Sequence, residues 1–138
     1  IKNYKILGEL GDFYRMLGDQ GKALSILEKA TTECVRHQDL RGMFVNRLRT
    51  AIAYQYNDQH VLANYIFEQL LRDSSVYVEL LNFVHHHYGK CLVEQGRFDV
   101  AMKHLIIARE LRVQMASSET LLKSSNEAID TLASDFRL

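Results

Sequence analysis

The stretch Tyr88-Gly89-Lys90-Cys91-Leu92, followed by Gly96, Ala101, Leu105 and Ala108, decides the fold of this chain. Two other stretches carry the same pattern and begin at Leu10-Gly11-Asp12-Phe13-Tyr14 and at Thr50-Ala51-Ile52-Ala53-Tyr54. In all three, the small residue of the opening run and the last matching position are equally far apart: 30 − 11 = 19, 70 − 51 = 19 and 108 − 89 = 19. An internal repeat of this length indicates stacked helical units, which usually act through an extended surface and not through a catalytic cleft.

The repeats resemble the tetratricopeptide repeat, which pairs two antiparallel helices and places small residues where they touch. The first and third repeats match best, whereas Thr50, Asp58 and Leu70 depart from the pattern in the second. The resemblance covers about residues 4–115. It implies an all-α, right-handed α-solenoid of about three antiparallel helix pairs plus a C-terminal helix. We expect one domain over residues 1–138, with repeats at about 4–37, 40–73 and 75–115 and a final helix at 118–136.

The repeats are longer than is usual in the family, where one repeat has about 34 residues. Their spacing is 54 − 14 = 40 and 92 − 54 = 38, and the chain contains no Pro, which the family places at the junction between repeats. We therefore expect longer helices through Cys34–His37 and Val76–Asn82. Repeats of this length resemble those of kinesin light chains and of MalT-like bacterial regulators, and the sequence does not choose between the two.

Turn and cap residues divide the chain into seven predicted helices. The helices are expected at residues 4–17, 20–37, 40–57, 60–72, 75–95, 98–115 and 118–136. Gly18 and Gly96 should end helices because glycine accepts the left-handed conformation, and Asn57 with Asp58 should act similarly. The predicted N-caps are Asp39, Ser74 or Ser75, and Ser117 or Ser118, whose side-chain oxygens can accept from free N–H groups.

The last predicted helix carries Leu121, Ala128, Leu132 and Phe136 at helical spacing. Leu132 is in phase with the repeats, because its separation from Leu92 (132 − 92 = 40) equals that between Tyr14 and Tyr54. The segment is therefore either the first helix of a fourth repeat or a capping helix. Its many polar residues favour the cap, because a solenoid needs a polar outer face at its end.

Composition excludes several classes of function. Lys and Arg number 17, as do Asp and Glu, so no net charge attracts nucleic acid or an acidic membrane. No apolar run approaches the ~20 residues of a membrane span, and no secretory signal is present. Two distant cysteines suit a reducing, cytoplasmic setting. The first residue is Ile and not Met, which indicates a fragment of a larger protein.

The run His85-His86-His87 is the most conspicuous candidate for chemistry. Neighbouring residues on a helix point in different directions, so these three imidazoles cannot bind one metal ion together. Cys91 with His87, and Cys34 with His37, could each supply half of a zinc site. Packing explains these residues more simply, and we predict no metal and no cofactor. Phosphate-binding, metalloprotease and hydrolase motifs are absent from the sequence, which predicts that the chain is not an enzyme.

The resemblance implies that the first helices of successive repeats line a concave, partner-binding face. Carried over position by position, the candidate partner-binding residues are Asp12, Arg15, Leu48, Ile52, Gln55, Tyr56, His86, Lys90 and Glu94. Apolar anchors among charges of both signs suit a peptide or helix with an apolar face. Asp12 and Gly8 stand where chaperone-binding relatives use Asn and Lys, and an Asp there would repel a ligand carboxylate. The predicted function is thus a protein–protein interaction or scaffold module that is not a chaperone carboxylate clamp.

Three alternatives remain open. The chain could be the ligand-sensing or signalling-peptide-sensing domain of a regulatory protein such as a transcription regulator. It could be a homo-oligomerisation module whose repeat ends stack. A partner could also contact the convex second helices, which carry Lys29, Arg36, Arg72, Arg109 and Arg112.

Overall fold

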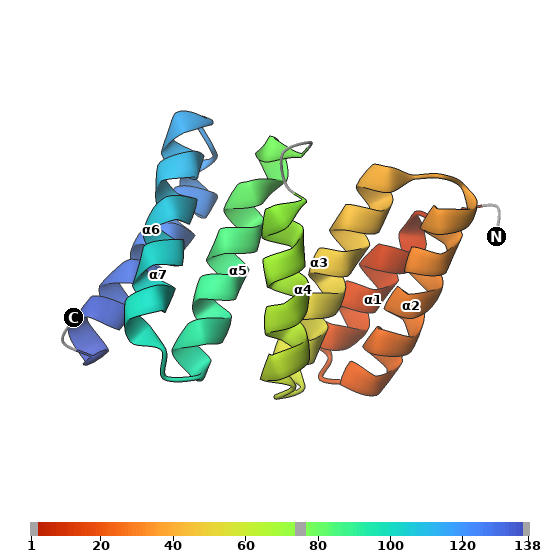
Figure 1. Ribbon diagram of the computed structural model, residues 1–138, viewed down its shortest axis with the longest axis horizontal. Helices are drawn as coiled ribbons and strands as arrows, with labels where there is room; N and C mark the ends of the chain where they lie inside the picture. The colour runs from red at the N-terminus through yellow and green to blue at the C-terminus, as the bar shows by residue number, and fades with distance from the viewer. Residues whose placement is uncertain (1–2, 74–76, 137–138) are drawn as a thin grey trace. The chain divides into compact units, whose positions relative to one another are not determined.

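The computed structural model describes residues 3–73 and 77–136, and in these ranges it contains only helices (Figure 1). The helices are α1 (Ile6–Met16), α2 (Gln20–Arg36), α3 (Leu40–Tyr56), α4 (His60–Arg72), the 3-10 helix η1 (Val78–Leu80), α5 (Leu81–Glu94), α6 (Phe98–Gln114) and α7 (Glu119–Phe136). The predicted all-α class is confirmed, and the helix bounds match the predicted ones closely everywhere except before α5. None of the described helices is both long and apolar enough to cross a membrane.

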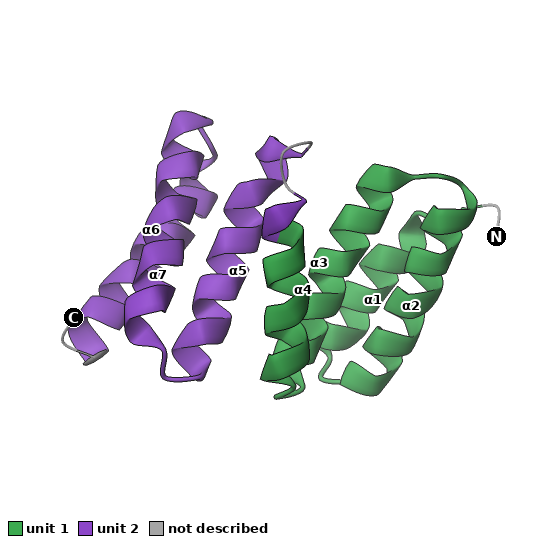
Figure 2. Cartoon of the chain, viewed as in Figure 1, with its two compact units in different colours: residues 1–70 green, residues 71–138 purple. Residues whose placement is uncertain are grey.

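The chain divides into two compact units, residues 1–70 and 71–138 (Figure 2). In unit 1, α1 packs against α2 and α3, and α2 packs against α3. In unit 2, α5 packs against α6 and α7, and α6 packs against α7. Each unit therefore places two first helices of the repeat pattern on a shared second helix. The single-domain organisation expected from the sequence stays a prediction.

Sharp turns of one kind connect most of the helices. Each contains one residue with a positive φ between 53° and 86°, and these residues are Gly18, Gln38, Asp58, Gly96 and Ala116. The N–H of the next residue donates a hydrogen bond to the carbonyl oxygen five positions earlier. Asp19 donates to Tyr14 at 2.9 Å, and Ser117 donates to Arg112 at 2.9 Å. This double closure of a helix end is the Schellman motif. Because the junction between the first two repeats uses the same turn as the interior of a repeat, it needs no proline.

The start of α5 differs from the prediction. A continuous helix was expected through Val76–Asn82, but Tyr77 has φ −121° and Val78–Leu80 form a 3-10 helix, so α5 begins at Leu81. The side-chain amide of Asn82 donates to the carbonyl oxygen of Glu79 at 2.9 Å, which stabilises this tighter turn. The predicted caps Ser74 and Ser75, like Val76, lie outside the described residues.

Two of the other predicted caps are confirmed. The carboxylate of Asp39 accepts from the N–H of Gly42 at 2.9 Å at the start of α3, and the hydroxyl of Ser118 accepts from the N–H of Leu121 at 3.3 Å before α7. At the other end of the first junction, α2 extends to Arg36 and is capped by His37. The prolonged second helix expected there is therefore confirmed to within one residue.

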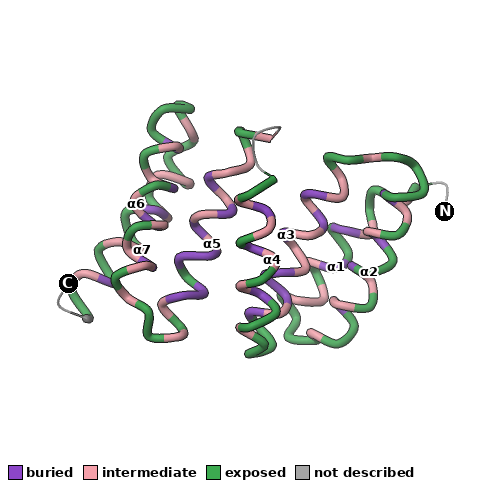
Figure 3. Tube along the Cα trace, viewed as in Figure 1, coloured by how far each residue is buried: buried purple, intermediate pink, exposed green. Residues whose placement is uncertain are grey.

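Small residues permit the closest approach of paired helices. A Cβ atom on Gly11 would lie 2.6 Å from the side chain of Leu27, and one on Gly89 would lie 2.7 Å from that of Leu105. Ala51 occupies the equivalent place in α3 and is fully buried. Buried residues recur along each of the α-helices (Figure 3). The repeat register derived from these three residues is confirmed.

We expect Gly89→Leu to destabilise the fold by roughly 1–3 kcal/mol or more, because Leu105 is itself buried and cannot move aside. Gly21 is the matched control, since it lies in α2 with open space around its missing Cβ. Gly21→Leu should be neutral or stabilise the helix by about 0.5 kcal/mol. Urea unfolding of both variants measures the difference, and equal effects would contradict the close contact.

Candidate functional site

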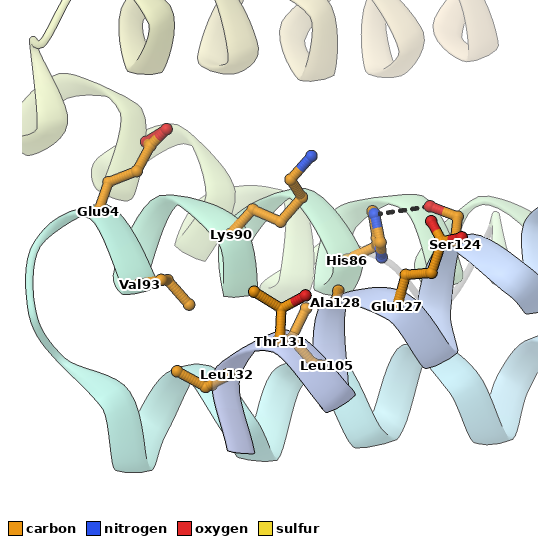
Figure 4. Close-up of a pocket in the computed structure, with 10 residues that line it drawn as sticks. All are labelled: His86, Lys90, Val93, Glu94, Leu105, Ser124, Glu127, Ala128, Thr131 and Leu132. Carbon is orange, nitrogen blue, oxygen red and sulfur yellow. Dashed lines mark hydrogen bonds between the residues drawn. The ribbon is translucent and has the colours of Figure 1, made fainter. Parts of the chain in front are cut away.

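A pocket of about 350 Å³ opens between α5 and α7 in unit 2 (Figure 4). Its lining residues are His86, Lys90, Val93 and Glu94 from α5, Leu105 from α6, and Ser124, Glu127, Ala128, Thr131 and Leu132 from α7. Val93 and Leu132 lie at one end, whereas His86 and Ser124 point toward one another at the other end. The pocket thus offers an apolar anchor site next to a polar end.

Buried Arg112 determines the hydrogen bonding of His86. Arg112 is 1% exposed and donates to the Asn82 side chain at 3.0 Å, to the Leu121 carbonyl at 3.1 Å and to Ser125 Oγ at 2.9 Å. Its Nη1 also lies 3.4 Å from Nδ1 of His86. A guanidinium can only donate, so this contact favours the tautomer in which Nδ1 accepts and the neutral ring carries its proton on Nε2.

The Nε2–H of His86 consequently faces the pocket as a donor. It lies 3.4 Å from Ser124 Oγ, which is a long hydrogen bond that a better acceptor could replace. Desolvation by burial, followed by the positive charges of Arg112 and Lys90, lowers the pKa of His86 to about 4. The ring is therefore neutral at pH 7, and the polar end of the pocket suits a hydrogen-bond acceptor such as a carbonyl or carboxylate oxygen.

The residues predicted from the sequence lie on the α5 side of this pocket, and those on α7 were not predicted. His86, Lys90 and Glu94 are predicted partner-binding residues, and all three line it. The side chains from α7 were missed because the polar composition of that helix favours a cap. The signal that could have revealed them is Leu132, which lies in phase with the repeats and forms part of the apolar end.

In unit 1 the predicted residues form a charged cluster on α1 and α3. The Asp12 carboxylate pairs with Arg49 at 2.9 Å and lies 3.7 Å from Arg15. The guanidinium of Arg15 stands 5.0 Å above the ring of Tyr56, which is 48% exposed, in a cation–π contact. Arg49 is not among the residues predicted from the sequence, because its partner lies on another helix.

The other predicted residues of unit 1 are buried. Leu48, Ile52 and Gln55 are 8%, 6% and 2% exposed, so they support the surface and do not form it. Oδ1 of Asp12 and Nε of Arg15 are buried and form the 3.7 Å ion pair with each other, whereas Oε1 of Gln55 is buried and has no hydrogen-bond partner among the described atoms.

The second helices of unit 1 offer a different surface. A hollow of about 550 Å³ there is lined by residues of α2, α3 and α4, among them Glu28, Val35 and Arg47. The alternative of a convex partner site therefore keeps a possible location. One of the basic residues expected on the convex second helices, Arg112 on α6 of unit 2, was placed wrongly. It is buried, and its long side chain reaches toward α5 and α7.

The two cysteines are free and buried. Desolvation is the first cause that raises both thiol pKa values, and it brings that of Cys91 to about 12. The Cys34 sulfur accepts from the Asn46 amide at 3.3 Å, and the Cys91 sulfur accepts from Gln95 at 3.4 Å. Protonated, packed thiols of this kind fit the structural role expected from the sequence.

No protein-family model matches the chain, and no curated protein does. Two solved structures resemble it, both described as a Podosopora anserina kinesin light chain with nearly identical TPR-like repeats. Both have a TM-score of 0.75, with 17% and 15% identity over 92% and 96% of this chain. The chain spans 64% of the length of the first structure and 68% of the length of the second, which is a single-substitution variant of the same protein. This likeness confirms a TPR-like repeat fold and the predicted resemblance to kinesin light chain repeats.

The lowered pKa of His86 predicts an acid-sensitive fold. The unfolded chain binds a proton near pH 6.5 but the folded ring binds it only near pH 4, so this contribution is complete above pH 6.5 and is lost as the pH falls toward 4. His86→Gln should therefore flatten the fall in unfolding free energy over this range by roughly 2 kcal/mol. Part of the fall should persist, because the pKa of His85 is also about 4. Denaturant unfolding at several pH values measures this, and an unchanged slope would contradict the assignment.

Proposed function

We propose that this chain is a non-catalytic protein-interaction module that holds an extended or helical peptide segment of a partner on its first helices. The observation that carries the proposal is the pocket between α5 and α7, which combines an apolar end with an outward-facing donor on His86. Ligand sites of this size are typically lined by apolar groups with a few placed polar ones. A partner side chain as large as Leu fits the apolar end, and its neighbouring carbonyl or carboxylate would accept from His86.

The charged cluster of unit 1 supports the same function. Tyr56 presents an exposed ring already held by Arg15, and Arg15 is in turn paired with Asp12. Aromatic and arginine side chains dominate the energetics of protein interfaces. We infer that Asp12, Arg15 and Tyr56 contact the partner, while Leu48, Ile52 and Gln55 fix the helix that carries them. In unit 2, the residues that contact the partner are His86, Lys90 and Glu94.

The chemistry of the site does not favour catalysis. His86 donates on one side and is bonded to Arg112 on the other, so it is held neutral and poorly placed to accept a proton. The buried thiols of Cys34 and Cys91 have raised pKa values and are weak nucleophiles. A cytoplasmic location and the absence of direct nucleic-acid contacts stay predictions from composition.

Peptide binding can be tested with a phage-displayed library of random peptides selected on the immobilised chain. We expect the selected peptides to lose at least tenfold in affinity for Val93→Glu, which places a charge in the apolar end. Tyr56→Ala should weaken peptides that bind unit 1 by roughly 2 kcal/mol. Val35→Glu is the matched control on the second helices. Loss of binding by Val35→Glu alone would transfer the site to that surface, and a library that yields no binders would contradict the proposal.

Self-association is a second candidate function, and a stripe on α1 favours it. Ile6, Leu10, Phe13 and Leu17 recur on one side of the helix, and all four are exposed. Contiguous exposed apolar patches usually mark interaction sites. Light scattering over a range of concentrations should show a mass that rises above the monomer, and Phe13→Glu should prevent this. Val61→Glu, at an exposed valine of α4, is the control, and a constant monomer mass would exclude this candidate.

A further inference from the structure

The three neighbouring histidines of α5 have different surroundings. His86 lines the pocket, and His87 packs edge-on against it with ring centroids 5.5 Å apart. His85 faces α6 instead, where its Nδ1 lies 2.9 Å from Nδ1 of His104. This divergence agrees with the expectation that the run cannot bind one metal ion together, but it also brings His85 next to a histidine of another helix.

Packing fixes the geometry of the His85–His104 pair. The two rings stack with centroids 5.2 Å apart and an interplanar angle of 28°. The ring of Tyr88, one turn after His85 and almost fully buried, packs against His104 at 4.7 Å. Both histidines nevertheless keep part of their surface exposed.

We propose that His85 and His104 together bind a divalent transition-metal ion that prefers cis ligands at right angles, namely Cu²⁺ or Ni²⁺. Two metal–nitrogen bonds of ~2.05 Å to atoms 2.9 Å apart enclose an angle of about 90°. That angle is the cis angle of square-planar and octahedral coordination, which Cu²⁺ and Ni²⁺ adopt with imidazole ligands. Tetrahedral Zn²⁺ would need a nitrogen separation of about 3.3 Å and should bind more weakly.

The protons balance without any co-reactant. In the metal-free pair, one ring donates its Nδ1–H to the lone pair of the other Nδ1. When an ion binds, the donating ring changes tautomer and carries its proton on Nε2, so both rings stay neutral and both Nδ1 lone pairs become ligands. Water completes the coordination.

The test is a calorimetric titration of the whole chain with Cu²⁺, Ni²⁺ and Zn²⁺ in a weakly coordinating buffer at pH 7. We expect one ion per chain, with Cu²⁺ bound most tightly and Zn²⁺ more weakly than Ni²⁺. His85→Asn and His104→Asn should each reduce the association constant for Cu²⁺ at least tenfold, and the double variant should lose little more. His87→Asn is the matched control from the same run of residues, and it should change the constant less than twofold.

Two outcomes would overturn the proposal. The first is Cu²⁺ binding that the His85→Asn and His104→Asn double variant retains at full strength. The second is an equal loss in His87→Asn, which would assign binding to the histidine run alone. Should a variant fail to fold by circular dichroism, proton NMR of the unmodified chain decides. Substoichiometric Cu²⁺ should broaden the ring signals of His85 and His104 before those of His87, and uniform broadening would refute the site.

Discussion

The close approach of paired helices at small residues is the constraint on which the rest of the structure depends. The side chain of Leu27 fills the space over Gly11, and that of Leu105 fills the space over Gly89. These contacts turn one side of each first helix toward its own second helix, so another side remains available for a ligand.

The two units use this framework to build different surfaces. Positions two repeats apart correspond, as 90 − 12 = 78 and 127 − 49 = 78 show, so the Asp12–Arg49 pair of unit 1 matches Lys90 and Glu127 in unit 2 with the charges reversed. Gly8 corresponds to His86, and the Arg49 side chain lies where a Cβ on Gly8 would be. Arg49 therefore occupies in unit 1 the space that corresponds to the pocket of unit 2. The equivalent positions thus hold an ion pair in unit 1 and line the pocket in unit 2.

The sequence predicts the repeats, their register, and nearly all helix bounds, because these depend on local spacing and on a few small residues. It also predicts that His86, Lys90 and Glu94 share a surface. It cannot predict the contacts that long side chains make across helices, and so it missed Arg49 beside Asp12, His104 beside His85, and the burial of Arg112. Hydrophobic periodicity likewise does not predict the 3-10 turn before α5, because a side-chain hydrogen bond of Asn82 stabilises that turn.

Arg112 links the stability of unit 2 to its site. The groups that accept its hydrogen bonds on Asn82, Leu121 and Ser125 are neutral, and they come from the start of α5 and from α7. A buried guanidinium needs nearly all of its donors paired, because each unpaired one carries a desolvation penalty. The arrangement of α5 and α7 that satisfies Arg112 is also the arrangement that forms the pocket and orients His86. Movement of α7 away from α5 would both leave the charge unsatisfied and open the polar end of the pocket, so the shape of the site is maintained by the interaction that anchors the last helix.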